Sequence, residues 1–145
     1  MNRRDLVLAI LSAADGRTYS PVQIQKAVFL VCEHFGEVID DGPAFDFQPY
    51  DYGPFDSDVY SEIEALRRAG EAVIAPSANG NWNTYAASDA GIERSNAILH
   101  GILNDETSNY IFAISNWVRS LSFKSLVKSI YEAYPQMRAN SIFRG

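Results

Sequence analysis

Apolar residues recur at helical spacing along most of the chain, and the two helices nearest the amino terminus have the clearest boundaries. The first is predicted over Arg3–Ala14 and ends at Asp15-Gly16, because glycine near the C-cap stops a helix. Ser20-Pro21 places an N-cap hydroxyl before a proline at the first helical position. This pair therefore predicts the start of a second helix, which runs to about Phe35.

The second helix is apolar on every side in its middle. Residues 28–32 are Val, Phe, Leu, Val and Cys, a pattern that is typical of a helix buried on most sides. We expect this helix to lie at the centre of the fold. Gln25 and Lys26 are its polar exceptions, and lysine is seldom fully buried unless it has a partner.

The segment Phe45–Phe55 differs from the rest of the chain, because five of its eleven residues are aromatic. Phe45 and Phe47 alternate with polar residues, which predicts a short, half-buried strand that Pro49 ends. The following Tyr52-Gly53-Pro54 predicts a turn in which glycine tolerates a positive φ. We call residues 50–53 the aromatic corner.

The remaining elements follow in a regular order. A third helix is predicted from about Asp56 to Gly70, and Ala72–Ala75 with Trp82–Ala87 predicts a β-hairpin whose turn is Asn79-Gly80. Three further helices are expected: one capped by Ser88-Asp89 that runs to about Leu99, one with the apolar stripe Tyr110, Ile114, Trp117 and Leu121, and one with the stripe Phe123, Val127, Ile130 and Tyr134, which Pro135 ends.

Three helices followed by a hairpin is the element order of a winged-helix domain. The sequence has no internal repeat, low-complexity segment or linker. We therefore predict an α+β fold that is mainly helical, with a winged-helix-like core and additional carboxy-terminal helices, in a single domain over residues 1–145.

Composition narrows the classes of protein. With 145 residues, 47% of them hydrophobic, the chain is typical of a globular domain. It contains no apolar run of the roughly 20 residues needed to span a membrane, and no signal-peptide pattern. The single cysteine, Cys32, fits a reducing compartment, so a cytoplasmic protein without a membrane partner is expected. The net charge of −6 lacks the basic footprint of nucleic-acid binding.

Residues that carry chemistry do not form a recognisable catalytic or metal motif. Cys32 and His34 point about 200° apart on a helix, so we interpret them as a core residue and a helix-end residue. The acidic segment does not match a calcium loop, and its members are expected to be solvated charges and N-caps. These acids are Asp40, Asp41, Asp46, Asp51, Asp56 and Asp58. No enzymatic activity, metal or cofactor is therefore predicted.

The aromatic corner allows two interpretations. Tyr50 and Tyr52 either plug the core beside the second helix, with Asp51 pairing with Lys26 or capping a backbone N–H, or they form a surface to which a partner docks. In the second case the rings of Tyr50, Tyr52 or Phe55 should be partly exposed, next to Tyr60. In both cases Lys26 is expected to be buried and bonded to an acid or carbonyl of the corner. The hairpin tip around Asn79 and Trp82 is the alternative surface.

Several short motifs resemble the Panacea domain, the SocA-type antitoxin-associated family, and most closely its YwgA-type relatives. They are Ile24-Gln25-Lys26-x-x-Phe29, Tyr52-Gly53-Pro54 followed by Val59-Tyr60, Leu66-x-x-x-Gly70, and Tyr131-Glu-Ala-Tyr-Pro135 with Asn140-Ser141. The resemblance covers residues 19–90 and 126–143. It departs from the family after the hairpin, where Ala87-Ser88-Asp89-Ala90-Gly91 stands in place of a Leu-Thr-x-x-Gly pattern.

The resemblance implies a small helical protein of bacteria or phages that neutralises a toxin encoded nearby or acts as an adaptor. It also implies structural roles for Gln25, Lys26, Gly53 and Pro54. The first hypothesis is therefore a protein-interaction module of a toxin–antitoxin or phage-defence system, with Tyr50, Asp51, Tyr52, Phe55 and Tyr60 as its protein-binding residues. Its partner would be another protein, and a homo-oligomer stays open.

The alternative hypothesis is a winged-helix transcriptional regulator that binds DNA. In such a protein the third helix enters the major groove. Here residues 56–68 contain more acids than arginines, so phosphates would repel this helix. Nucleic acid is therefore not the expected partner.

Overall fold

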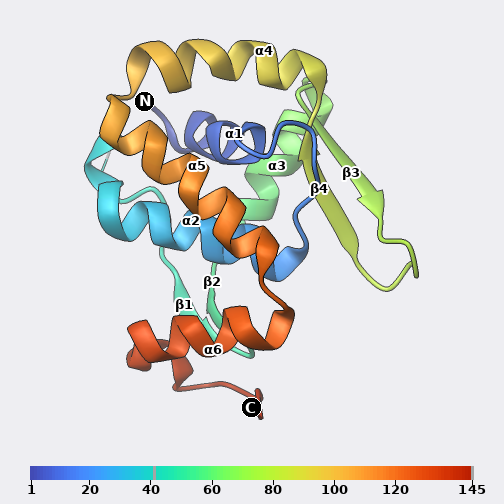
Figure 1. Ribbon diagram of the computed structural model, residues 1–145, viewed down its shortest axis with the longest axis vertical. Coiled ribbons are helices and arrows are strands. Elements are labelled where there is room, and N and C mark those ends of the chain that lie inside the picture. Colours follow the sequence, from blue (N-terminus) through green and yellow to red (C-terminus); the bar gives the residue numbers. More distant parts are fainter. Residues whose placement is uncertain (41, 145) are drawn as a thin grey trace.

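The computed structural model describes residues 1–40 and 42–144, and over these residues the chain has an α+β fold that is mainly helical (Figure 1). This part of the chain contains six α-helices and two sheets, each of two antiparallel strands. The elements are α1 (Arg3–Ser12), α2 (Pro21–Phe35), β1 (Gln48–Tyr50), β2 (Gly53–Phe55), α3 (Asp58–Arg68), β3 (Ala72–Pro76), β4 (Asn83–Ala87), α4 (Asp89–Ala97), α5 (Asp105–Ser120) and α6 (Phe123–Ala133).

Two helices share the centre of the molecule. In α2 the residues 24–31 are all buried, as its apolar middle predicts. In α1 the residues 6–12 are all buried as well, so α1 is enclosed no less than α2. Figure 1 shows why, since α4, α3 and α5 surround α1 while α2 lies below it. None of the described helices is long and apolar enough to span a membrane.

The segment around the aromatic corner differs from the prediction. Phe45 and Phe47 lie outside any strand, and the strand begins only at Gln48. Strand β1 pairs with β2 in a hairpin in which Pro49 lies opposite Pro54. Because alternate pairs of an antiparallel ladder exchange no N–H bonds, two facing prolines can occupy one such pair. The predicted positive φ of Gly53 is confirmed, at 104°.

The hairpin β3–β4 and helix α4 agree with their predicted positions. Pairing runs from Ala72 opposite Ala87 to Pro76 opposite Asn83. The hydroxyl of Ser88 then accepts a bond from the N–H of Gly91 and caps α4. A Cβ atom at Gly91 would lie 2.0 Å from the backbone oxygen of Glu71. Glycine therefore lets α4 approach the start of β3 closely.

The apolar stripe expected on α5 is confirmed in part. Tyr110, Ile114 and Leu121 pack half-buried against the core, whereas Trp117 is exposed. The fully buried face is instead formed by residues such as Ile111, Ser115 and Val118.

The small side chain of Ser115 leaves room for Tyr19, whose hydroxyl donates to the carbonyl of Ile10 at 2.6 Å. A carbonyl only accepts, so the hydroxyl of Ser115, also 2.6 Å away, donates to the Tyr19 oxygen. A small polar residue of α5 therefore faces the buried ring of Tyr19 and pairs with its hydroxyl.

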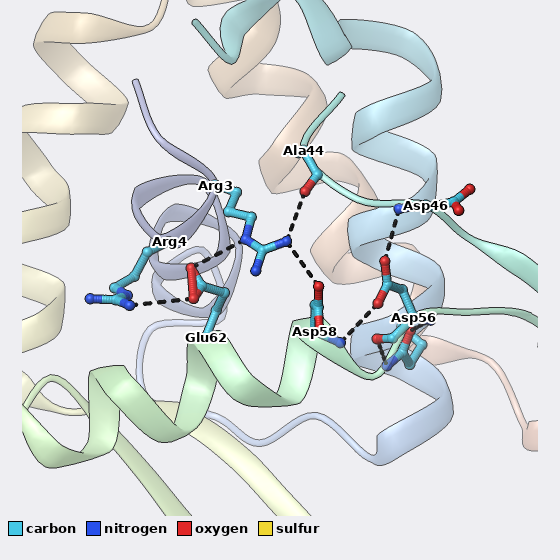
Figure 2. Close-up of polar contacts among 8 residues, drawn as sticks. Arg3, Arg4, Ala44, Asp46, Asp56, Asp58 and Glu62 are labelled. Atoms are coloured by element: carbon cyan, nitrogen blue, oxygen red, sulfur yellow. Dashed lines mark hydrogen bonds and ion pairs between the residues drawn. The ribbon is translucent and has the colours of Figure 1, made fainter. Parts of the chain in front are cut away.

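Ion pairs between charged side chains connect α1 to α3 (Figure 2). Glu62, nearly buried on α3, pairs with both Arg3, at 3.6 Å, and Arg4, at 3.4 Å. Arg3 also contacts Asp58 and donates to the carbonyl of Ala44 at 3.2 Å. The two arginines that open α1 are therefore partners of α3 and of the loop before β1, and they hold this loop in place.

Candidate functional site

The aromatic corner is attached to α2 by two consecutive side chains. Gln25 donates to the backbone oxygen of Asp56 at 2.9 Å and accepts from the N–H of Asp56 at 3.1 Å. Lys26, the next residue, donates to the carbonyl of Pro54 at 3.2 Å. Both side chains lie inside the fold, with exposed fractions of 1% and 3%. They connect α2 to the end of β2, so that the corner cannot shift along the helix.

The predicted burial of Lys26 is confirmed, and its bond partner lies one residue beyond the corner, at Pro54. Gly53 lies against this side chain, and a Cβ there would meet Lys26 Cε at an ordinary contact distance of 3.4 Å. Its φ of 104° is the feature that favours glycine at this position. The Lys26–Asp51 pair, one of the two roles that the core-plug interpretation allowed for Asp51, is not present among the ion pairs of the described residues. Desolvation by burial lowers the pKa of Lys26 from 10.5 to about 7.

The carboxy-terminal tail holds the other side of the corner. The backbone oxygen of Asp51 accepts from Ser141 Oγ at 3.1 Å and from the N–H of Ile142 at 3.0 Å. Asn140 donates to the oxygen of Pro49 at 3.0 Å, and Tyr131 donates to Ser141 Oγ at 2.6 Å. The tail therefore fixes the turn of a hairpin that is about ninety residues away in sequence.

A groove of about 550 Å³ lies beside the corner, and we call it the aromatic groove. It is formed by the first turns of α2, the β1–β2 hairpin, Tyr60 of α3, the tip of the β3–β4 hairpin, and the junction of α5 with α6. Its lining residues are Ser20, Pro21, Val22, Gln23, Gln25, Lys26, Tyr50, Asp51, Tyr52, Gly53, Phe55, Tyr60, Trp82, Leu121, Phe123 and Leu126.

The structure brings all five predicted protein-binding residues to this groove. Tyr50 and Tyr52 are 54% and 40% exposed, so neither ring is a core plug. Tyr50 stacks on Phe55 with ring centroids 5.1 Å apart, and Phe55 lies 5.9 Å from Tyr60. Asp51 lines the same groove. Tyr60 itself is half-buried, and burial raises the pKa of its hydroxyl to about 12, so it is neutral at physiological pH.

Sequence reasoning missed the contribution of α6. Phe123 was expected on the apolar stripe of its helix, but it is 46% exposed and packs edge-on against Tyr52 at 4.9 Å. Val127 and Ile130 of the same stripe are buried. The available signal was the position of Phe123 directly after the N-cap Ser122, where the first turn of a helix extends beyond the core. Trp82, predicted as part of a separate surface, lies on the same groove.

Several of the acidic residues bond to backbone N–H groups or form ion pairs. The carboxylate of Asp56 accepts from the N–H groups of Asp46 and Asp58, each at 2.8 Å, and Asp40 contacts the terminal ammonium at 2.6 Å. Asp41 lies outside the described residues. Across residues 1–40 and 42–144, no cluster of three or more histidine, cysteine or acidic side chains could hold a metal ion.

Cys32 and His34 have separate surroundings. Burial raises the pKa of the Cys32 thiol to about 12, so the reactive thiolate is disfavoured. His34 lies with its Nδ1 3.0 Å from the oxygen of Leu30 and 2.9 Å from the hydroxyl of Tyr110. Neither Cys32 nor His34 lines the aromatic groove. In that groove, exposed aromatic rings and the buried Lys26 occur together.

No known protein family matches the chain, and no curated protein is significantly similar to it.

Proposed function

We propose that the protein is a non-enzymatic protein-interaction module that binds a partner protein through the aromatic groove. The main support for this proposal is the exposure of Tyr50 and Tyr52. The corner that holds them is hydrogen-bonded to α2 on one side and to the carboxy-terminal tail on the other. Aromatic rings held in place on a rigid frame lose little conformational entropy on binding, and such rings dominate the energetics of many interfaces. Replacing either ring should therefore weaken partner binding without unfolding the protein.

The resemblance to the Panacea domain indicates what kind of protein the partner is. Its motif residues Gln25, Lys26, Gly53 and Pro54 correspond in this fold to the contacts between α2 and β2. By this resemblance the partner is a toxin or defence effector encoded beside the gene, and the protein acts as an antitoxin or adaptor. This assignment stays a prediction from the sequence.

A winged-helix DNA-binding regulator is less well supported. The order α1, α2, α3, β3, β4 agrees with a winged helix, and we retain a winged-helix-like core as part of the proposal. However, the β1–β2 hairpin lies between α2 and α3, and α3 carries Glu64 on its exposed side, paired with Arg67. An arginine already paired with an acid has less charge to offer to phosphate.

Site-specific photo-crosslinking tests the proposal. p-Benzoylphenylalanine at Tyr52 should crosslink to one protein in lysate of the native host, and to the same protein after purification. The matched control is the same group at Ile102, which is 63% exposed and outside the groove. Equal crosslinking from both positions, or none from Tyr52 with the purified neighbour-encoded protein, would contradict the proposal.

A further inference from the structure

The ammonium group of Lys26 has fewer bonds than it can form. Its three N–H donors have one acceptor among the described protein atoms, the carbonyl of Pro54 at 3.2 Å. The side chain is 3% exposed, so bulk water does not compensate. A buried, incompletely bonded cation is costly, and the cost is removed when an anion binds beside it. Because Lys26 also lines the aromatic groove, an anion that enters the groove could provide this compensation.

The charges around the groove indicate an anion with one negative charge. Lys26 and Asp51 are the charged side chains of its lining, and the exposed Lys124 follows the lining residue Phe123 in sequence. Asp51 would oppose a phosphate group, which carries nearly two negative charges. A carboxylate has one charge and accepts bonds from an ammonium at short distance. The single buried cation therefore fits a carboxylate better than a phosphate.

The apolar part of the groove indicates what accompanies the carboxylate. Its volume of about 550 Å³ is within the range of sites that hold drug-sized ligands. Phe55, Tyr60 and Phe123 line the groove, and an aromatic guest can pack against such rings in stacked or edge-on geometry. Tyr50 and Trp82 stay 54% and 45% exposed at the rim, where a chain that continues out of the groove would cover them.

We propose that the aromatic groove binds a segment of the partner protein in which an aromatic side chain stands next to a carboxylate, and that this carboxylate pairs with Lys26. The inference rests on the proposed function, since it specifies the chemistry by which the partner is recognised. Lys26 supplies charge selectivity, while the rings of the groove supply most of the contact area.

Four probes test this by NMR titration at about pH 6, below the pKa of Lys26 of about 7. The first is a serine–alanine hexapeptide that ends in phenylalanine with a free carboxyl terminus, and the second is its carboxyl-terminal amide. The third is the amide with glutamate added after phenylalanine. The fourth is 3-phenylpropionate, a small aromatic acid without peptide groups.

Both acidic peptides, or one of them, should bind at least about tenfold more tightly than the neutral amide, as expected for a bond to a charged group. The stronger of the two shows whether the carboxylate is terminal or on a side chain. Equal binding of acid and amide, or no binding of any peptide at about 10 mM, would overturn the proposal. Phenylpropionate binding as tightly as the peptides would overturn it too, in favour of a small aromatic acid.

Lys26→Met keeps an apolar stem and removes the charge, and it should bind acidic and neutral peptides equally, within about twofold. Retained preference for the acids in this variant would assign the selectivity to another group and overturn the proposal. Should the variant not fold, the same conclusion follows from the Lys26 Cε resonance of the wild type, which should titrate at a higher pH when the acid is bound. An unchanged titration counts against it.

The two proposals fail separately. If crosslinking from Tyr52 identifies a partner whose affinity is the same for wild type and Lys26→Met, the interaction module stands and the carboxylate inference falls. If the acidic peptides bind by way of Lys26 but no partner crosslinks from Tyr52, the carboxylate site stands and the proposed function falls.

Discussion

Gln25 and Asp56 exchange two hydrogen bonds between one side-chain amide and both backbone groups of a residue thirty-one positions away. Asp56 follows the last residue of β2, where the hairpin ladder ends. The amide of Gln25 therefore takes the place of a strand partner, and it satisfies two backbone groups that would otherwise be left without one. In this way a helix side chain continues the pairing of a short hairpin.

Gln25→Ala should destabilise the protein by about 2–4 kcal/mol, because a buried backbone donor and acceptor both lose their partner. Urea unfolding followed by circular dichroism measures this directly. Gln48→Ala is the control, since Gln48 is exposed and its side chain donates only to Asp46 in the described structure. The control should stay within about 0.5 kcal/mol of the wild type. Equal stabilities of the two variants would show that the Gln25 contacts contribute little.

The positions of the elements could largely be predicted from the sequence, because caps and apolar periodicity are local signals. Ser20-Pro21 marks the start of α2, and Ser88 that of α4, as the structure has them. The β1–β2 hairpin could not be predicted in register. Two prolines within a short segment are evidence against strand pairing when the sequence is read locally. The hairpin forms because Pro49 and Pro54 face each other in one pair, where no N–H bonds are needed.

The candidate site could be predicted in part. Tyr50, Tyr52 and Lys26 stand out locally, as aromatic residues beside a turn and as a lysine in an apolar helix. The contributions of Phe123 and of the tail residue Ser141 depend on contacts between segments about seventy and ninety residues apart. Single-residue patterns contain no information about which distant segments meet, so these contributions required the structure.

Lys26→Met should change how stability depends on pH. The pKa of Lys26 is about 7 in the folded state and about 10.5 in the unfolded chain. Between these values the unfolded chain binds more protons, so the wild type gains stability as pH rises from about 7. Below about pH 7 the full cost of the buried charge is present. The variant lacks this dependence.

The unfolding free energy of the variant minus that of the wild type should therefore fall by about 2–3 kcal/mol from about pH 7 to 9. Urea unfolding of both proteins at several pH values measures it. The raised pKa of Cys32 lowers stability above about pH 9 in both proteins, so its effect cancels in the difference. A pH-independent difference would show that Lys26 keeps an ordinary pKa.

Gly91→Ala should be strongly destabilising, although alanine is normally the better helix former by about 1 kcal/mol. The new Cβ would lie 2.0 Å from the oxygen of Glu71, so α4 has to move away from β3 or the backbone has to shift. We expect a loss of more than about 2 kcal/mol. Gly101→Ala is the matched control, because a Cβ there has no neighbour within 4 Å. A stabilised Gly91→Ala would mean that the helix shifts freely.

Thermal unfolding of corner variants separates an exposed surface from a core plug without knowledge of the partner. Tyr52 is 40% exposed and contacts Phe123 by its edge, and Tyr50 is 54% exposed. Each replacement by alanine should therefore lower the melting temperature by only a few degrees, which corresponds to about 1 kcal/mol for a protein of this size. Partner capture should nevertheless be lost.

Tyr131→Ala is the matched comparison, because Tyr131 lies under the same corner but is 4% exposed and donates to Ser141. It should cost about 3–5 kcal/mol, as is usual when a large buried side chain is truncated, and lower the melting temperature by roughly 10 °C or more. If Tyr50→Ala and Tyr52→Ala both lose that much, the rings contribute to the core, and the interface has to be sought at the hairpin tip around Asn79 and Trp82. Small losses in both, with a large loss for Tyr131→Ala, place the two rings on the surface of the fold, as the proposed interface requires.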